Sequence, residues 1–184
     1  MDHAARARAL NVLGFLLGWL ACVGGAALGR PWLGPAAALL LVSAHAAESA
    51  HPARELRRLA AVGLFGVAVE SAALGAGLYG YAGGGAVWWL APAWIVSLWL
   101  LLGATFESSL LSLARRPRLA APAGAIGGAL SFALAMKLGA VRFIVPASLG
   151  LALVAILWAA LLPLAFAVSR YAGSVTVTHW WGAL

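Results

Sequence analysis

Long apolar segments, separated by short segments that carry arginine, constrain the fold of this chain most. Several of them hold the roughly 20 residues that an α-helix needs to cross about 30 Å of hydrocarbon. The residues are 64% hydrophobic and only 9% charged, whereas a soluble domain is about half apolar and about a quarter charged. A chain with so little polar surface must expose its helices to lipid. We therefore predict an all-α, polytopic transmembrane helix bundle that forms a single domain over residues 1–184.

Six membrane spans fit the apolar segments. Pro31 and Pro35 flank the start of the second span and Pro52 follows its end, and proline is tolerated at such positions but not deep inside a helix. This second span is short. Beyond the last span, Trp180 and Trp181 are typical of an interfacial tail. The predicted spans cover residues 9–29, 33–49, 59–82, 87–114, 119–140 and 144–171, and the tail covers 172–184.

The positions of the arginines predict how the spans are oriented. If the N-terminus is cytoplasmic, only Arg30 and Arg142 fall in outer loops, and Lys137 falls within a span. Cytoplasmic loops carry an excess of Lys and Arg, so both termini are expected inside. The composition, rich in alanine, arginine, glycine and leucine, favours a bacterial inner membrane. The arginines then assigned to the cytoplasmic side are Arg6, Arg8, Arg54, Arg57, Arg58, Arg115, Arg116, Arg118 and Arg170.

The formal net charge of +7 does not indicate nucleic-acid binding. In a soluble protein such a charge would suggest a nucleic-acid partner, but here the arginines occur in short caps between apolar segments, which is a topology signal. The partners that we expect are membrane lipid and a hydrophobic small molecule.

Small residues recur at a spacing of three to four in two spans. One face of the third span carries Gly63, Gly66, Glu70, Ala73 and Gly77. Small residues at this spacing let helix backbones approach closely within a membrane. We expect these faces to point inward, and they are also the surfaces through which the chain could form a homo-oligomer or bind a partner membrane protein. The corresponding face of the fifth span carries Gly124, Gly127, Gly128, Ser131 and Ala135.

Two acidic residues lie inside predicted spans. Glu70 is near the middle of the third span, and Glu107 lies about two turns inside the arginine end of the fourth. A carboxylate at such a depth is costly unless it is paired, hydrated or neutral, so each is a functional hypothesis. Glu70 is expected to be buried and neutral, and either to donate a proton or to tie helices together. Both acids are candidate catalytic residues.

A polar cluster is predicted near the cytoplasmic ends of the second and fourth spans. His45 and Glu48 are three residues apart and therefore share a helical face, at a depth similar to that of Glu107 and Ser108. We predict that these four residues line one cavity that opens toward the cytoplasm and serves proton transfer, headgroup binding or metal binding. The candidate ligand-binding residues are His45, Glu48, Thr105, Ser108, Ser109 and Ser131.

No motif for a metal or a cofactor is found. His45 and His51 are six residues apart, about 240° around a helix, whereas metal-binding histidine pairs on helices normally stand four apart. Ser108 and Ser109 lack the GxSxG context of a serine nucleophile. The sequence also has no phosphate loop and no dinucleotide fingerprint. We therefore expect no metal and no cofactor.

Several short motifs along the chain are shared with one family. On these residues the chain resembles an uncharacterised bacterial inner-membrane family, the domain of unknown function 2878. The resemblance implies a six-helix polytopic fold, and the neighbourhood of fatty-acid-modifying genes implies lipid handling. That family is associated with aspartate at the position of Glu70 and with histidine at that of Ser108, so this chain departs from it there. The shared residues are Asn11-x-x-x-Phe15-x-x-Gly18-Trp19, Pro31-Trp32-Leu33-Gly34-Pro35, His45, Thr105-x-x-Ser108-Ser109-Leu110 and Gly127-Gly128-x-Leu130-Ser131-Phe132.

Three functions are open at this point. The first is an integral membrane protein that binds or handles a lipid-like molecule through a polar intramembrane pocket. The second is a small-solute transporter or a substrate-capture subunit, and the third is a membrane-embedded, isomerase-like enzyme that uses acid/base chemistry on a lipid. A lipid handler should have an opening between helices, a capture subunit a pocket open to the outside, and an enzyme two acid/base groups around one cavity.

Overall fold

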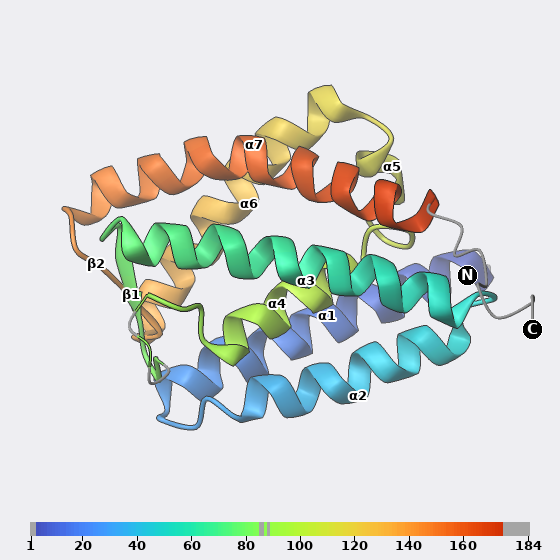
Figure 1. Cartoon of the computed structure of the whole chain (residues 1–184), viewed down its shortest axis with the longest axis horizontal. Helices are drawn as coiled ribbons and strands as arrows, with labels where there is room; N and C mark the ends of the chain where they lie inside the picture. The colour runs from blue at the N-terminus through green and yellow to red at the C-terminus, as the bar shows by residue number, and fades with distance from the viewer. Residues whose placement is uncertain (1–2, 85–86, 88, 175–184) are drawn as a thin grey trace, which may run out of the picture.

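The computed structural model describes residues 3–84, 87 and 89–174 (Figure 1). The predicted tail tryptophans Trp180 and Trp181 lie outside these residues. The order of elements along the described chain is α1 (His3–Ala27), α2 (Leu33–Glu48), α3 (Pro52–Gly75), β1 (Tyr79–Tyr81), α4 (Ala93–Gly103), α5 (Leu111–Ala114), α6 (Pro117–Leu138), β2 (Val141–Phe143) and α7 (Ala147–Ser174).

The prediction of an all-α helix bundle of membrane type is confirmed. Within the described residues, four helices are long and apolar enough to cross a membrane: α1, α3, α6 and α7. Their outer faces carry large exposed apolar side chains, among them Leu17, Leu64, Ile126 and Ile156. The second and fourth predicted spans correspond to shorter apolar helices, because α2 has 16 residues and α4 has 11.

The fourth predicted span, 87–114, is not one continuous helix. Helix α4 begins after Pro92 and ends at Gly103, and turns lead from there to α5. The Thr105 hydroxyl donates to the carbonyl of Leu102 at 2.6 Å. Hydroxyl side chains compete with the backbone for hydrogen bonds in this way and favour turns over helix interiors. The dense polar segment around Thr105 therefore interrupts the helix.

A short antiparallel strand pair, β1 with β2, was not predicted. Tyr79 pairs with Phe143, and Tyr81 with Val141. We had assigned β1 to the end of the third span, which instead ends at Gly75. The chain leaves α3 and α6 through glycines of positive φ, 69° at Gly77 and 86° at Gly139, a conformation that glycine adopts without a steric penalty. These turns fold the two strands across the end of the bundle.

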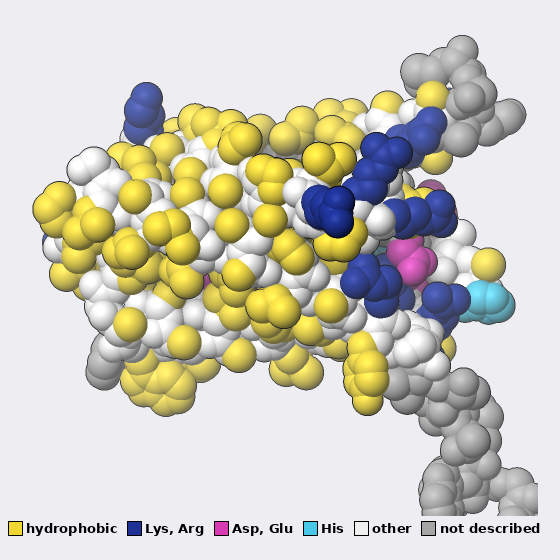
Figure 2. Space-filling model, turned by 90° about the horizontal axis from the view of Figure 1, so that it is seen from above, with side chains coloured by type: hydrophobic (Ala, Val, Ile, Leu, Met, Phe, Trp, Pro, Cys, Tyr) yellow, Lys and Arg dark blue, Asp and Glu magenta, His cyan; other side chains and the backbone are white. Residues whose placement is uncertain are grey.

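Opposite ends of the bundle differ in charge. Helix α1 begins, α3 begins and α7 ends at one end, and the strand pair lies at the other (Figure 1). Figure 2 shows most of the visible Lys and Arg side chains, together with acidic and histidine side chains, at one end of the molecule. We call this end, where Arg54, Arg58 and Arg170 lie on α3 and α7, the arginine-rich end.

Two stacked tryptophans fill the centre between α3 and α6. The rings of Trp99 and Trp158 lie 5.2 Å apart at an interplanar angle of 16°. A Cβ added at Gly66 would overlap the Trp99 ring, and one added at Gly128 would overlap Trp158. The glycine faces point inward at Gly66 and Gly128, as expected, and receive aromatic rings from within the same chain. Two predicted members differ, because Gly77 lies beyond the end of α3 and Gly127 is exposed.

Candidate functional site

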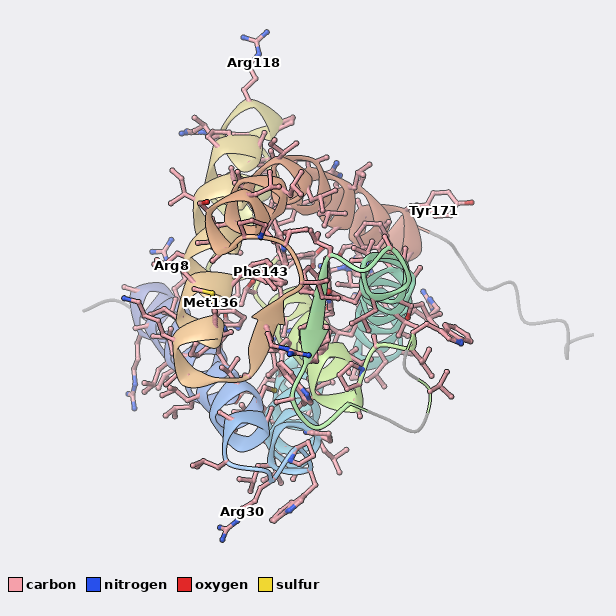
Figure 3. All side chains as sticks on the ribbon, turned by 90° about the vertical axis from the view of Figure 1, so that its left-hand side faces the viewer. Arg8, Arg30, Arg118, Met136, Phe143 and Tyr171 are labelled. Carbon is pink, nitrogen blue, oxygen red and sulfur yellow. The ribbon has the colours of Figure 1, made fainter. Side chains whose placement is uncertain are left out.

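The main cleft of the bundle has a volume of about 640 Å³ and is lined by α1, α4, α6 and α7, together with Glu70 of α3 and Leu113 of α5. Sites for small molecules typically measure about 300–1,000 Å³ and are mostly apolar with a few polar groups. Glu70 is the one charged residue among the lining residues that the structure describes, and Ser131 adds a hydroxyl. Figure 3 looks onto the strand end of the bundle, where Phe143 lies among the helices and Arg30 points away from them.

The cleft opens sideways between α1 and α6. Leu16 and Leu20 on α1 line it, as do Leu130 and Leu134 on α6. All four side chains are 44% to 58% exposed. The wall of the cleft at α1 and α6 is therefore open to its surroundings, and the exposed side chains there are apolar.

Three donors hold the Glu70 carboxyl group at the inner wall of this cleft. Tyr79 donates its hydroxyl to Oε2 at 2.8 Å, and the hydroxyl of Tyr81 donates to the same oxygen. The indole N–H of Trp99 donates to Oε1 at 3.1 Å. Glu70 is 2% exposed, so its expected burial is confirmed. Both tyrosines come from β1, the strand that was not predicted from the sequence.

Ser131 joins α6 to α1 within the cleft. Its Oγ accepts a hydrogen bond of 2.9 Å from the indole N–H of Trp19. This bond places one hydroxyl group on the wall of an otherwise apolar surface.

A second polar group of residues lies at the arginine-rich end, and we call it the ion-pair cluster: His45, Glu55, Arg58, Glu107 and Ser169. Arg58 is 2% exposed and is its centre. Its Nη1 lies 2.6 Å from Glu55 Oε2 and 2.7 Å from Glu107 Oε2. Its Nε and Nη2 both donate to Ser169, at 3.1 and 3.0 Å. Buried charges are normally paired in this manner because an isolated one is very costly.

His45 and Glu107 belong to one network of ion pairs and hydrogen bonds, in which Glu55, Arg58 and Ser169 complete the set. His45 Nε2 lies 2.9 Å from Glu55 Oε1, and Glu55 in turn contacts Arg58. Glu48 is exposed and Ser108 is half-buried, and no side-chain contact is recorded between either residue and the described part of the ion-pair cluster. None of His45, Glu48, Glu107 and Ser108 lines the main cleft.

Sequence reasoning missed Glu55, Arg58 and Ser169. We had assigned Arg58 to a cytoplasmic loop and begun the third span at residue 59, whereas α3 begins at Pro52. The signal was present in the spacing of Glu55 and Arg58, since an acid and a base three residues apart on a helix can pair.

The remaining predicted polar residues fix the segment between α4 and α5. The Ser109 hydroxyl donates to Asn11 Oδ1 at 2.7 Å, and Asn11 Nδ2 donates to the carbonyl of Ala104 at 3.1 Å. Thr105 is buried and bonded to its own helix end. Asn11 on α1 thus tethers the interrupted part of the fourth span.

The two candidate catalytic acids lie in different places. Glu70 lines the main cleft, while Glu107 belongs to the ion-pair cluster and leaves half of its side chain exposed. No set of three His, Cys, Asp or Glu residues suited to a metal ion occurs in the described part of the chain. The cleft therefore offers one carboxyl group with fixed donors and a large apolar surface.

Comparison with known proteins leads to a single family. No curated protein and no solved structure matches the chain. A family model described as protein of unknown function (DUF2878) matches residues 8–164, which is most of the chain. The protein is therefore a member of this DUF2878 family, as its motifs had indicated.

Proposed function

We propose that the protein binds a hydrophobic, lipid-like molecule in the main cleft, which the molecule enters sideways from the hydrocarbon. The observation that carries the proposal is the opening between α1 and α6, which is lined by the exposed side chains of Leu16, Leu20, Leu130 and Leu134. A ligand with a long apolar part gains about 25 cal/mol for each Å² of apolar surface that it removes from water. It gains less from lipid, so the shape of the cleft and its polar groups must supply selectivity.

Glu70 and Ser131 are the polar groups that would orient such a ligand, because they are the acidic and the hydroxyl side chain on the described wall, which otherwise consists of apolar and aromatic side chains and glycine. The proposal thus differs from the sequence-based one in its location. It uses Glu70 and Ser131 within the bundle, and leaves His45 and Glu107 to the ion-pair cluster. The protein would act in a bacterial cytoplasmic membrane with the arginine-rich end inside.

The two alternative functions have less support. A substrate-capture subunit requires a pocket that opens to the aqueous phase, whereas the described cleft opens between apolar side chains. An acid/base enzyme requires two titrating groups around the reacting atoms. Glu70 has tyrosine hydroxyls beside it, but the second acid, Glu107, is not a lining residue of the cleft.

The test fills the cleft with a side chain at a position where a Cβ meets no neighbouring atom. Gly127 lines the cleft, and a Cβ added there would meet no atom within 4 Å. Gly24 on α1 is equally free of neighbours but does not line the cleft, so it is the matched control. Wild-type protein, Gly127→Leu and Gly24→Leu would each be purified in native lipid particles, and the molecules that co-purify would be identified by mass spectrometry.

We expect one class of apolar molecule to be enriched with the wild type and with Gly24→Leu, and to fall at least about five-fold with Gly127→Leu. Equal amounts with all three proteins would show that the cleft is not the binding site.

A further inference from the structure

We propose that the ligand of the main cleft is a hydrophobic cation, whose positive group is held by the Glu70 carboxylate and whose apolar body lies in the cleft. This inference rests on the proposed function, since it specifies the chemistry of the molecule that the cleft binds. It follows from three observations: the charge balance of the cleft, the hydrogen bonds of Glu70, and the aromatic residues around it.

Among the described residues, the wall of the cleft has an acid and no base. Glu70 is the charged residue on its described wall, and Lys, Arg and His do not occur there. The polar groups recorded on Glu70 are the phenols of Tyr79 and Tyr81 and the indole of Trp99, none of which is a cation. By contrast, Arg58 neutralises the acids of the ion-pair cluster. The fold therefore pairs its buried acid at the arginine-rich end but leaves the acid in the cleft without a cationic side chain.

Glu70 is expected to be neutral in the empty cleft, and its three donors leave one acceptor position at which the ionised carboxylate can bind a cation. An ionised carboxylate accepts at about four positions. Two of these are taken on Oε2 by the tyrosines and one on Oε1 by Trp99, whose N–H can only donate. Donors favour the ionised form, whereas burial without a counter-charge favours the neutral form. A ligand cation beside Oε1 would use the remaining position and remove the cost of the buried charge.

Aromatic residues supply a wall that suits a cation with an apolar body. Five of them line the cleft, and aromatic rings attract cations that lie within about 6 Å of their faces. The volume of about 640 Å³ is large enough for a drug-sized molecule. Anionic lipids would meet the carboxylate with no compensating base. The aromatic lining residues are Phe15, Trp19, Trp99, Phe132 and Trp158.

The shared chemistry, a positive group on an apolar body, can come from a free lipophilic cation or from a lipid with an amine headgroup. Tetraphenylphosphonium and tetraphenylborate are suitable probes because they have nearly the same shape and opposite charge. Binding of each would be measured by quenching of tryptophan fluorescence in nanodiscs of digalactosyldiacylglycerol, a lipid with neither charge nor amine, so that the membrane itself does not concentrate one probe over the other. Signals from empty nanodiscs would be subtracted.

We expect tetraphenylphosphonium to bind the wild type saturably and tetraphenylborate to bind at least ten-fold more weakly. Glu70→Gln should weaken phosphonium binding at least ten-fold, while Glu48→Gln, which removes an exposed acid outside the cleft, should leave it unchanged. Gly127→Leu should weaken the binding of both probes. If phosphatidylethanolamine added to the nanodiscs competes with phosphonium, the natural ligand is a lipid with an amine headgroup. If phosphatidylethanolamine does not compete, the natural ligand is a free lipophilic cation.

Equal binding of the two probes by the wild type, or full phosphonium binding by folded Glu70→Gln, would overturn the inference. If Glu70→Gln does not fold, as judged by its near-UV circular dichroism, the charge selectivity of the wild type decides alone. The proposed function fails separately, since it predicts loss of an apolar co-purifying molecule in Gly127→Leu whatever the charge of that molecule.

Discussion

Replacement of Arg58 by leucine should destabilise the protein more than any other single change in the ion-pair cluster. Arg58 is 2% exposed, and its guanidinium contacts Glu55, Glu107 and Ser169. Removal of one partner from a buried ion pair leaves the other charge uncompensated and typically costs about 3 to 5 kcal/mol. Arg58→Leu leaves the Glu55 carboxylate, which is 8% exposed, with His45 as its remaining recorded partner.

Replacement of the acids of the cluster should lower the free energy of unfolding in proportion to their burial. Glu107 leaves 50% of its side chain exposed, so water screens its interaction with Arg58, and Glu107→Gln should cost less than about 1 kcal/mol. Glu55→Gln keeps hydrogen-bonding atoms near Arg58 and His45, and Arg58 keeps Glu107. The destabilisation by Glu55→Gln should therefore lie between those of Glu107→Gln and Arg58→Leu, at about 1 to 3 kcal/mol.

Unfolding of the purified variants in mixed micelles, followed by circular dichroism, measures this order. A double variant, Glu55→Leu with Arg58→Leu, completes the series because it removes both buried charges at once. It should be more stable than Arg58→Leu alone, since a well-packed apolar pair often replaces a buried ion pair without loss. The reasoning is refuted if Glu107→Gln destabilises as much as Arg58→Leu, or if the double variant is the least stable of all.

Three further predictions concern the cleft and the topology. Glu70→Gln should retain most of the stability, whereas Glu70→Ala leaves three buried donors without an acceptor and should cost about 1 to 3 kcal/mol for each, measured by the same unfolding assay. An alanine at Gly128 would overlap a tryptophan ring and should cost about 1 to 3 kcal/mol, while alanine at the unobstructed Gly127 should be neutral by thermal unfolding. Reporter fusions after Gly84 and after Pro117 should report outside and inside respectively, and the same side for both would contradict the predicted topology.

The long helices could be predicted from the sequence because hydropathy is a local property that needs no knowledge of neighbours. The apolar segments correspond to α1, α3, α6 and α7, and the spacing of Gly63 and Gly66 indicated which face of α3 points inward. The interruption after Gly103 was missed because an apolar segment with a few hydroxyl residues still reads as one span. The competition of Thr105 for a backbone carbonyl becomes visible only in the structure.

The candidate site could be predicted only in part, because its polar groups meet through tertiary contacts. The depth of Glu70 within an apolar segment indicated an unusual acid. The hydrogen bonds that Tyr79 and Tyr81 donate to it could not be predicted, because a strand of three residues such as β1 has no recognisable sequence pattern. The turn at Gly77 makes that return possible.

An arginine in a membrane protein can have two roles, and the sequence alone does not distinguish them. An arginine near the end of a span can set the topology, or it can neutralise a buried acid, and both uses place it at the same depth. Arg54, with a half-exposed side chain, fits the first use, whereas Arg58, four residues later, fits the second. Arg54 and Arg58 are about one helical turn apart at the start of α3. Only the positions of Glu55 and of α7 in the structure distinguish their roles. For the same reason, the absence of a basic residue from the described wall of the cleft says more about the ligand than the number of arginines in the chain does. The fold supplies a cation to one buried acid and not to Glu70, and that difference is what makes a ligand cation the natural partner of the cleft.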